Sequence, residues 1–302
     1  MRRVALAAIA AALLLVGCTP GSAERAKAPD PSASTASAGQ PAPKPKLVAT
    51  ITVKRGSQLE RDIVPQLAKA FELTDEAVKS QLAAASSDLI SKDAKGFRRM
   101  EGMISPGTYE VREDSALDEL VATWVTASEG RYARVAESVA KPNDLSLSER
   151  LTLASMVDAE CLGGDGRDKV AAAFLNRLSD HQRLQSCVTA EYAVGFQRPY
   201  LLNKDVEVKS AYNTYTTDGL PAGPICAVSD ESLAVASAMS QDADVYYFFY
   251  DYMAGELHFF SDYTKFRKAA VASRARFDAE STVDAHDKVN KQDLYGKGND
   301  EQ

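Results

Sequence analysis

Apolar residues recur every three to four positions along much of this chain, a spacing that predicts amphipathic helices. Shorter stretches that alternate, or that are apolar throughout, predict strands. The predicted helices are 59–71, one after Thr74, 114–140, 147–160, 167–179, one from about Ala190, and 229–240. The predicted strands are 47–53, a short one after the Pro106–Gly107 turn, 245–250 and its hairpin partner 257–260. This order predicts an α+β fold, with a small α/β module at 47–140 and a mainly helical lobe with a short β-hairpin at 141–275.

The helix predicted over 147–160 ends in an acid on its apolar side. Ser146 and Glu149 have the spacing of a capping box, which predicts a helix start near Leu147. The apolar residues within about 60° of Glu160, at ~100° per residue, are Leu153, Met156 and Val157. Burial disfavours a charged carboxylate, so we expect the pKa of Glu160 to lie above the ordinary value of a glutamate. Glu160 is therefore a candidate general acid.

A second acid, Asp158, lies roughly 200° away around the same helix and should point to the opposite side. The two carboxyls are therefore not expected to form a facing catalytic pair. The alternative interpretation of Glu160 is a solvated residue at a helix end, and the motifs downstream decide between the two.

The N-terminus has the pattern of an export signal. Residues 1–17 combine Arg2 and Arg3 with an apolar run that is shorter than the ~20 residues of a membrane-spanning helix. The four residues that end at Cys18 resemble the lipobox of bacterial lipoproteins, which predicts lipidation of Cys18 and an anchor on the extracytoplasmic face of the cell membrane; a simple secretory peptide is the alternative. Residues 18–46, rich in Pro, Ala and Ser, predict a disordered tether. Residues 276–302 turn polar and predict a frayed helix followed by disorder.

Charge and cysteine content narrow the choice of partners. The net charge is −7, with no basic cluster outside the signal, so nucleic acid is not expected as a partner. In an exported chain we expect Cys187 and Cys226 to pair as a disulfide and Cys161 to remain free. The rival interpretation of the cysteines is a metal site. A metal site is weakly supported because the three histidines, at positions 181, 258 and 286, do not have the spacing of metal ligands, so neither a metal nor a cofactor is expected. We expect His258 to be a hydrogen-bonded residue of a strand.

Six motifs follow one another in the second half of the chain. They are LASMVDAE at 153–160, FLNRL at 174–178, RLQS at 183–186, AYNTY at 211–215, GLPAGPI at 219–225 and LHFF at 257–260. In this order and spacing they resemble the YceG-like family, the endolytic murein transglycosylases usually called MltG. The segment EGMISPGTYEV at 101–111 is similar to the part ahead of that family's catalytic lobe. The resemblance covers roughly 47–275 and implies a lysozyme-like catalytic lobe at 141–275.

The resemblance also assigns the acid. In that family the second acidic residue of a stretch similar to VDAE is the catalytic acid, and this position is Glu160 here. The first acidic position, usually Glu, is Asp158 in this chain. Two loops depart from the family's pattern, at Cys187–Val188 and at Pro221–Ala222, which concerns loop rigidity more than chemistry. Most relatives carry a spanning helix where this chain has a lipobox, and any sugar-binding LysM-like part is reduced or absent.

The implied reaction is cleavage of the β-1,4 bond between N-acetylmuramic acid and N-acetylglucosamine within nascent glycan strands of peptidoglycan. Glu160 would protonate the leaving oxygen, and the C6 hydroxyl of the sugar would attack C1 to leave a 1,6-anhydro end. The family implies a role in terminating glycan elongation, and hence a partner in the peptidoglycan synthase machinery.

Several polar and aromatic side chains of these motifs are candidates for glycan binding. They are Asn176, Arg177, Gln185, Tyr212, Asn213, Thr214 and Tyr215. The alternative for 211–215 is a well-packed loop with its tyrosines in the core. Arg177 could meet a stem-peptide or lactyl carboxylate, or hold Glu160 or Asp158 in the fold. A direct contact with Glu160 would lower its pKa and argue against the mechanism.

Three other functions stay open at this point. A muramidase-type hydrolase would need a second carboxylate about 5 to 9.5 Å from the first, and Asp165 is the near candidate. A non-catalytic peptidoglycan-binding lipoprotein would bind glycan without cleaving it. A solute-binding lipoprotein would need two similar lobes, which the uneven division near residue 140 does not favour.

Overall fold

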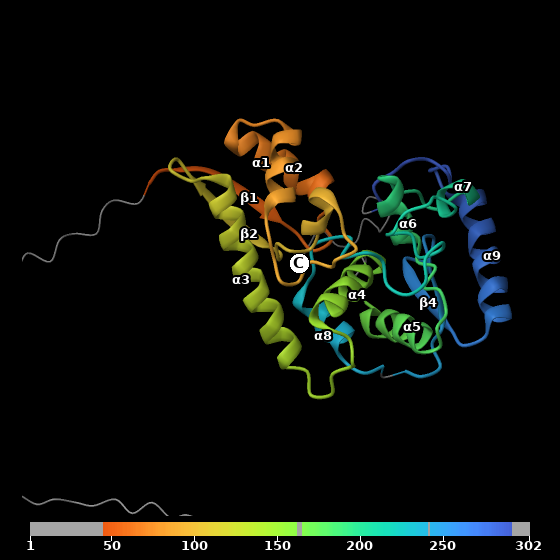
Figure 1. Cartoon of the computed structure of the whole chain (residues 1–302). Helices are drawn as coiled ribbons and strands as arrows, with labels where there is room; N and C mark the ends of the chain where they lie inside the picture. Colours follow the sequence, from red (N-terminus) through yellow and green to blue (C-terminus); the bar gives the residue numbers. More distant parts are fainter. Residues whose placement is uncertain (1–44, 162–164, 241, 292–302) are drawn as a thin grey trace, which may run out of the picture. The chain divides into compact units, whose positions relative to one another are not determined.

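The computed structural model describes residues 45–161, 165–240 and 242–291, which belong to one compact unit that begins at Pro45 (Figure 1). The predicted signal, Cys18 and the tether up to residue 44 lie outside the described residues. Among the helices of the described part, none combines the length and the apolar character that crossing a membrane requires. The described elements mix helices with two small sheets, so the predicted α+β class is confirmed.

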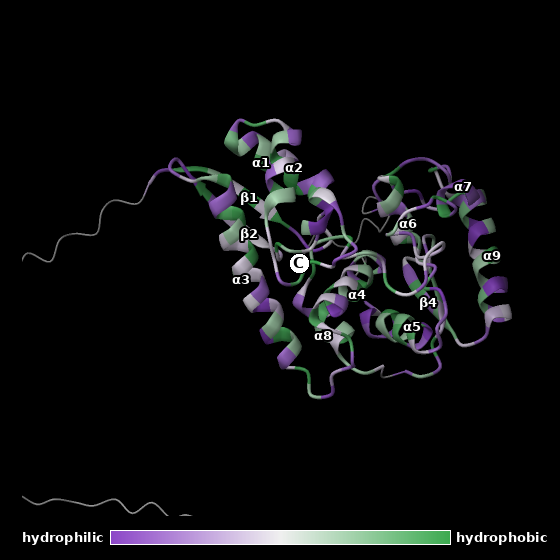
Figure 2. Ribbon diagram, in the orientation of Figure 1, coloured by the Kyte–Doolittle hydropathy of each residue, from purple (hydrophilic) through white to green (hydrophobic). Residues whose placement is uncertain are grey.

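The N-terminal part combines three helices with a two-stranded antiparallel sheet (Figure 1). Strand β1 (Leu47–Val53) pairs with β2 (Gly107–Arg112), with Ile51 opposite Tyr109. Between and after them the elements are a π-helical turn (Leu59–Ile63), α1 (Val64–Phe71), α2 (Asp75–Ala84), a 3-10 turn (Gly96–Met100) and α3 (Leu117–Glu137). Polar and apolar bands alternate along α3 in Figure 2, as expected for a helix with one buried side.

The second part is mainly helical. Its helices are α4 (Leu147–Glu160), α5 (Arg167–Ser179), α6 (Cys187–Val194), α7 (Asn203–Val206), α8 (Asp230–Ser237) and α9 (Tyr263–Glu280). Its strands β3 (Tyr247–Asp251) and β4 (Glu256–Phe260) form the predicted hairpin. The predictions for α4 and α5 are confirmed at both ends of each helix.

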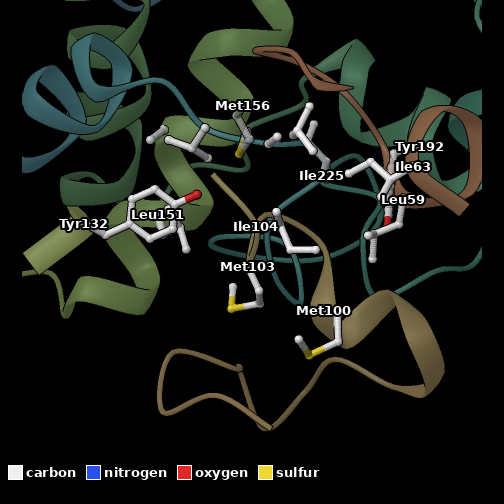
Figure 3. Packing of buried hydrophobic residues seen from close by; sticks show 14 of the residues in the cluster. Leu59, Ile63, Met100, Met103, Ile104, Tyr132, Leu151, Met156, Tyr192 and Ile225 are labelled. Carbon is white, nitrogen blue, oxygen red and sulfur yellow. The ribbon is translucent and has the colours of Figure 1, made fainter. Parts of the chain in front are cut away.

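The helix α4 lies at the centre of this part. Every residue from 151 to 158 is buried, so α4 is covered on all sides rather than on one stripe. Figure 3 shows Leu151 and Met156 of α4 facing Met103 and Ile104 of the N-terminal part. Residues on both sides of the predicted boundary at 140 thus belong to one hydrophobic core.

The predicted disorder after the last helix is wrong for residues 281–291. Helix α9 continues to Glu280, and the chain then packs back along the 197–200 segment. The Tyr200 N–H donates to the Ala285 carbonyl at 3.0 Å, and the Val289 N–H donates to the Gln197 carbonyl at 3.1 Å. These backbone hydrogen bonds, rather than an apolar pattern, hold the segment, so no hydrophobic periodicity marks it.

The predicted disulfide between Cys187 and Cys226 is also wrong. Cys161, Cys187 and Cys226 are all free thiols. The Cys226 thiol lies 3.2 Å from the Ser155 carbonyl in the core, whereas the Cys187 thiol lies 3.2 Å from the Tyr215 hydroxyl. Each sulfur therefore has a hydrogen-bonding partner of its own in a different environment.

Candidate active site

The start of α4 is fixed by its own sequence. Ser146 Oγ accepts a hydrogen bond from the Glu149 N–H at 3.3 Å, and Glu149 Oε2 accepts one from the Ser146 N–H at 2.8 Å. This reciprocal pair is the predicted capping box, and it satisfies two N–H groups that the helix itself leaves unpaired. Fourteen residues later the helix ends at Glu160.

Asp158 ties α4 to α8 and does not reach the cleft at the end of the helix. Its buried carboxylate accepts hydrogen bonds at 2.7 Å from the Ser229 N–H and the Ser232 hydroxyl, at the start of α8. The guanidinium groups of Arg55 and Arg167 lie 3.6 and 3.8 Å from it. The prediction that Asp158 points away from Glu160 is therefore consistent with its contacts, and its role is to hold two helices together.

Glu160 lies at the N-terminal end of α6. Its Oε1 accepts a hydrogen bond of 2.6 Å from the hydroxyl of Ser186, the residue that precedes α6. Burial raises the pKa of Glu160 above its ordinary value, and the Ser186 hydroxyl, the charge of Lys291 and the Val188 N–H each lower it in part. The net shift of the Glu160 pKa is upward, so this carboxyl holds its proton more tightly than a fully exposed carboxyl, although it still lines a cleft.

The cleft next to Glu160 has a volume of about 410 Å³. Its walls are the end of α4, the start of α5 and the β3–β4 hairpin. Gly166 lets the hairpin come close, because with φ of +92° it adopts a conformation that favours glycine, and a Cβ there would lie 3.1 Å from the Phe259 ring. Tyr250, Leu257 and Phe259 give the hairpin wall flat and apolar surfaces of the kind that pack on sugar rings.

Other carboxyl groups line the same cleft. Asp165, the candidate second acid, is exposed there, and Asp168 and Glu256 lie beside it. The geometry therefore places Glu160 among carboxylates that face solvent. Within the described residues, no group of three or more His, Cys, Asp or Glu side chains has an arrangement suited to a metal ion.

The 211–215 loop is mostly a packed loop. Tyr212 stacks at an angle on Tyr192 in the core, with ring centroids 4.9 Å apart. The fully buried Asn213 donates through Nδ2 to the carbonyls of Val206 and Val208 at 2.9 and 2.8 Å. These contacts hold the loop, so Tyr212 and Asn213 fit the alternative interpretation of a well-packed loop rather than that of glycan-binding residues.

The other two polar residues of the loop lie next to the acid's surroundings. Thr214 Oγ1 accepts a hydrogen bond of 3.0 Å from the Ser186 N–H, which fixes the residue that binds Glu160. The Tyr215 hydroxyl lies 3.2 Å from the Cys187 thiol, one residue further along. Thr214 and Tyr215 thus hold the start of α6, the helix whose preceding residue binds Glu160.

The remaining candidates have different surroundings. Asn176 is buried and donates to the carbonyls of Asp242 and Val245, which holds the loop before β3. Arg177 donates to the Tyr246 and Leu184 carbonyls at 2.8 and 2.7 Å, and its hydrogen-bond partners include neither Glu160 nor Asp158. Gln185 is exposed beside Ser186, with a φ of 48°. Of these three side chains, Gln185 is exposed, Arg177 is half-buried and Asn176 is buried.

Two features of the site escaped the sequence interpretation. Ser186 lay within a motif, but its contact with Glu160 depends on how α4 and α6 meet. The ion pair between Lys291 Nζ and Glu191 Oε1, at 2.7 Å, links the C-terminal segment to α6, and no local pattern marked it. His258 lies in β4 as predicted, with its Nε2 3.3 Å from Glu256 Oε1 and its ring stacked on Phe249.

The fold and the site define a mixed α+β protein whose helical lobe presents one carboxyl of raised pKa to an open cleft. The chain belongs to the YceG-like family, whose model matches residues 32–272. A crystal structure of a YceG-like protein from Listeria monocytogenes is similar to it at 26% identity and a TM-score of 0.65, covering 73% of this chain and 76% of that one.

Two curated relatives are named endolytic murein transglycosylase. The protein from Bacillus subtilis strain 168 is 30% identical over 236 residues, which cover 72% of this chain and 63% of that protein. The protein from Streptococcus pneumoniae serotype 2 is 29% identical over 236 residues, which cover 70% of this chain and 42% of that protein. The chain therefore spans less than two thirds of the length of these relatives.

Proposed function

We propose that this protein is an endolytic lytic transglycosylase that cleaves the bond between N-acetylmuramic acid and N-acetylglucosamine within peptidoglycan strands. The observation that carries the proposal is Glu160, a carboxyl of raised pKa at the edge of an open cleft. The names of the two relatives support the same reaction class.

The reaction uses the Glu160 carboxyl twice. First it gives its proton to the glycosidic oxygen, the C1–O bond breaks, and N-acetylglucosamine leaves with a new hydroxyl. Then the C6 hydroxyl of the muramic acid bonds to C1 and returns its proton to the Glu160 carboxylate. No water is consumed, and the product ends in a 1,6-anhydro ring.

The side chains around Glu160 suit both steps. The Ser186 hydroxyl donates to the carboxylate and so favours its ionised form, whereas burial favours the protonated form. A carboxyl balanced between two opposing influences can act as acid and then as base. The exposed Gln185 next to Ser186 is the polar side chain we assign to the sugar.

Purified peptidoglycan digested with the protein, followed by mass spectrometry of the soluble products, tests this function. We expect fragments with anhydro ends from the native protein and none from Glu160→Gln. The matched control is Glu280→Gln, which makes the same change at the exposed last residue of α9. Absence of any release by the native protein would leave a glycan-binding lipoprotein as the function.

A muramidase-type hydrolase is the second candidate. The observation in its favour is that Asp165 lines the same cleft as Glu160. A hydrolase gives reducing ends instead of anhydro ends and would lose activity in Asp165→Asn. The lyase predicts anhydro ends and a nearly unchanged rate in that variant.

We also propose that the protein is a lipoprotein, anchored through Cys18 on the outer side of the cell membrane. The lipobox-like sequence up to Cys18 and the following tether support this location. We expect a peptidoglycan synthase in the same membrane as a partner, because a protein that ends a growing glycan strand must work where that strand is made. Labelling with a fatty-acid analogue should mark the native chain and not Cys18→Ala.

A further inference from the structure

The C-terminal strap, residues 281–291, lies beyond the part of the chain that the family model matches. Figure 1 shows it as the dark-blue segment that leaves α9 and returns toward α6. Besides its bonds to Gln197 and Tyr200, the strap accepts a hydrogen bond from the Arg198 guanidinium at the His286 carbonyl. The Lys291 N–H donates to Gln197 Oε1 at 3.1 Å. A segment with this many specific hydrogen bonds is part of the folded unit.

Lys291 is the feature of the strap that requires an explanation. Its residue is only 5% exposed, and its ammonium group pairs at 2.7 Å with Glu191, which is 3% exposed. Taking two charges out of water is costly, and their attraction often does no more than offset that cost. A buried pair of this kind therefore contributes little to stability by itself, which directs attention to what surrounds it.

The pair lies on the helix whose N-terminal end binds the acid. Glu191 is one helical turn after Cys187 on α6, so both face the same side of that helix, and the Ser186 hydroxyl before them binds Glu160. Against the larger effect of burial, the charge of Lys291 lowers the pKa of Glu191, to which it is hydrogen-bonded, and it also lowers the pKa of Glu160 and of the Cys187 thiol. The last turn of α4, the helix α6 and the strap line one cleft together, so these three elements meet one residue from Glu160.

We propose that Lys291 is a positioning residue of the reaction, which the C-terminal strap brings to the helix that binds Glu160 and which Glu191 holds in place. Resting on the proposed function, this assigns the strap a part in the second step. There the acid has given up its proton and must remain ionised until the C6 hydroxyl returns one. A fixed ammonium nearby stabilises that carboxylate in a setting where burial opposes it.

The other groups around Glu160 do not supply a buried positive charge that would stabilise its carboxylate. The charged residues that line its cleft are Asp165, Asp168, Lys169 and Glu256; the first three are exposed at the start of α5, and Glu256 is exposed on the hairpin. Burial raises the pKa of each nearby thiol and phenol, so these groups are neutral at pH 7: Cys161, Cys187, Tyr215, Tyr250 and Tyr252. Among the described groups that shift the pKa of Glu160, Lys291 is therefore the buried one with a positive charge.

The test compares Lys291→Met with Lys288→Met in the full-length protein. Lys288 belongs to the same strap but is exposed and lies over the Phe196 ring, 4.3 Å from its centroid, so its loss is the matched control. For Lys291→Met we expect the alkaline limb of the pH profile of kcat/KM to move to higher pH, with about a tenfold loss of kcat at pH 7. Lys291→Arg, which keeps the charge, should show most of the native pH profile. Lys288→Met should show the native profile unchanged.

A second readout does not depend on activity. Titration of the Glu160 carboxyl by 13C NMR should show a higher midpoint in Lys291→Met than in the native protein. If the lone Glu191 prevents folding, the double variant Glu191→Gln/Lys291→Met gives the same test without an unpaired buried charge. An unchanged midpoint in the folded variants would overturn the role of Lys291. A native protein that releases nothing from peptidoglycan would instead overturn the proposed function, with the titration still able to decide on Lys291.

Discussion

Two acids of raised pKa, the buried Glu101 and the half-buried Glu160, differ in what their surroundings allow. Burial raises the pKa of both, that of Glu101 to about 7. Glu101 is 1% exposed and accepts hydrogen bonds from the Leu59 N–H and the Tyr192 hydroxyl, at 3.0 and 2.9 Å, so it joins α6 to the N-terminal part. Glu160 instead lines an open cleft. A raised pKa therefore marks a catalytic group only where substrate has access to the carboxyl.

The largest expected effect separates the two acids by activity. Glu160→Gln removes the transferable proton and should lower the rate of glycan cleavage by roughly 10²- to 10⁴-fold while leaving thermal unfolding nearly unchanged. Glu101→Gln should keep most of the activity. Rates from released muropeptides and melting temperatures from calorimetry check both; a fully active Glu160→Gln would remove the distinction.

The second prediction concerns the pH dependence of stability. The folded-state pKa of Glu101, about 7, lies above its ordinary value of 4.5, so the folded protein holds this proton more tightly than the unfolded chain. Its contribution to stability is full below pH 4.5 and is lost as the pH rises through 7, amounting to about 3 kcal/mol at most. Urea unfolding at a series of pH values should show this slope in the native protein and a flatter one in Glu101→Gln.

A smaller effect is expected at the hydrogen bond that Ser186 gives to Glu160. Ser186→Ala removes a donor that favours the ionised carboxyl, so the pKa of Glu160 should rise further. We expect about a tenfold lower kcat, the equivalent of one hydrogen bond to a charged group, and a shift of the alkaline limb of the pH profile to higher pH. Ser210→Ala, at a serine outside this contact, serves as the control. An identical profile in both variants would mean that the bond does not act on the acid.

The smallest effect is expected at Cys187. Because its thiol is free, Cys187→Ser should change the free energy of unfolding by only about 1 kcal/mol, far less than the loss of a disulfide. Alkylation of the denatured, unreduced protein should label Cys161, Cys187 and Cys226 alike. Protection of Cys187 and Cys226 together would reinstate the disulfide.

What the sequence predicted well depends on neighbours along the chain. The capping box at Ser146 and the position of Glu160 on α4 follow from spacing within one helix, and both are confirmed. The polar residues of the 211–215 loop were harder, because an asparagine that binds backbone carbonyls, as Asn213 does, has the same letter as one that binds sugar. The hydrogen bond from Ser186 depends on how two helices meet.

The strap and the cysteines show the other limit. Residues 281–291 are polar, and they are held by bonds to the 197–200 segment that lies about ninety positions earlier, which no periodicity records. Cys187 and Cys226 had a plausible spacing, but a spacing in sequence carries no distance in space. Glu101 was missed because it lies between an arginine pair and a turn, where an acid is ordinarily solvated.

The core that α4 shares with Met103 and Ile104 has a consequence for any attempt to dissect the protein. If the lobe that carries Glu160 were expressed from residue 141 onward, Leu151 and Met156 would lose part of their apolar cover and face water. Such a fragment should aggregate or bind detergent rather than stay monomeric in solution. The N-terminal sheet and helices are in this sense the other half of the protein's interior.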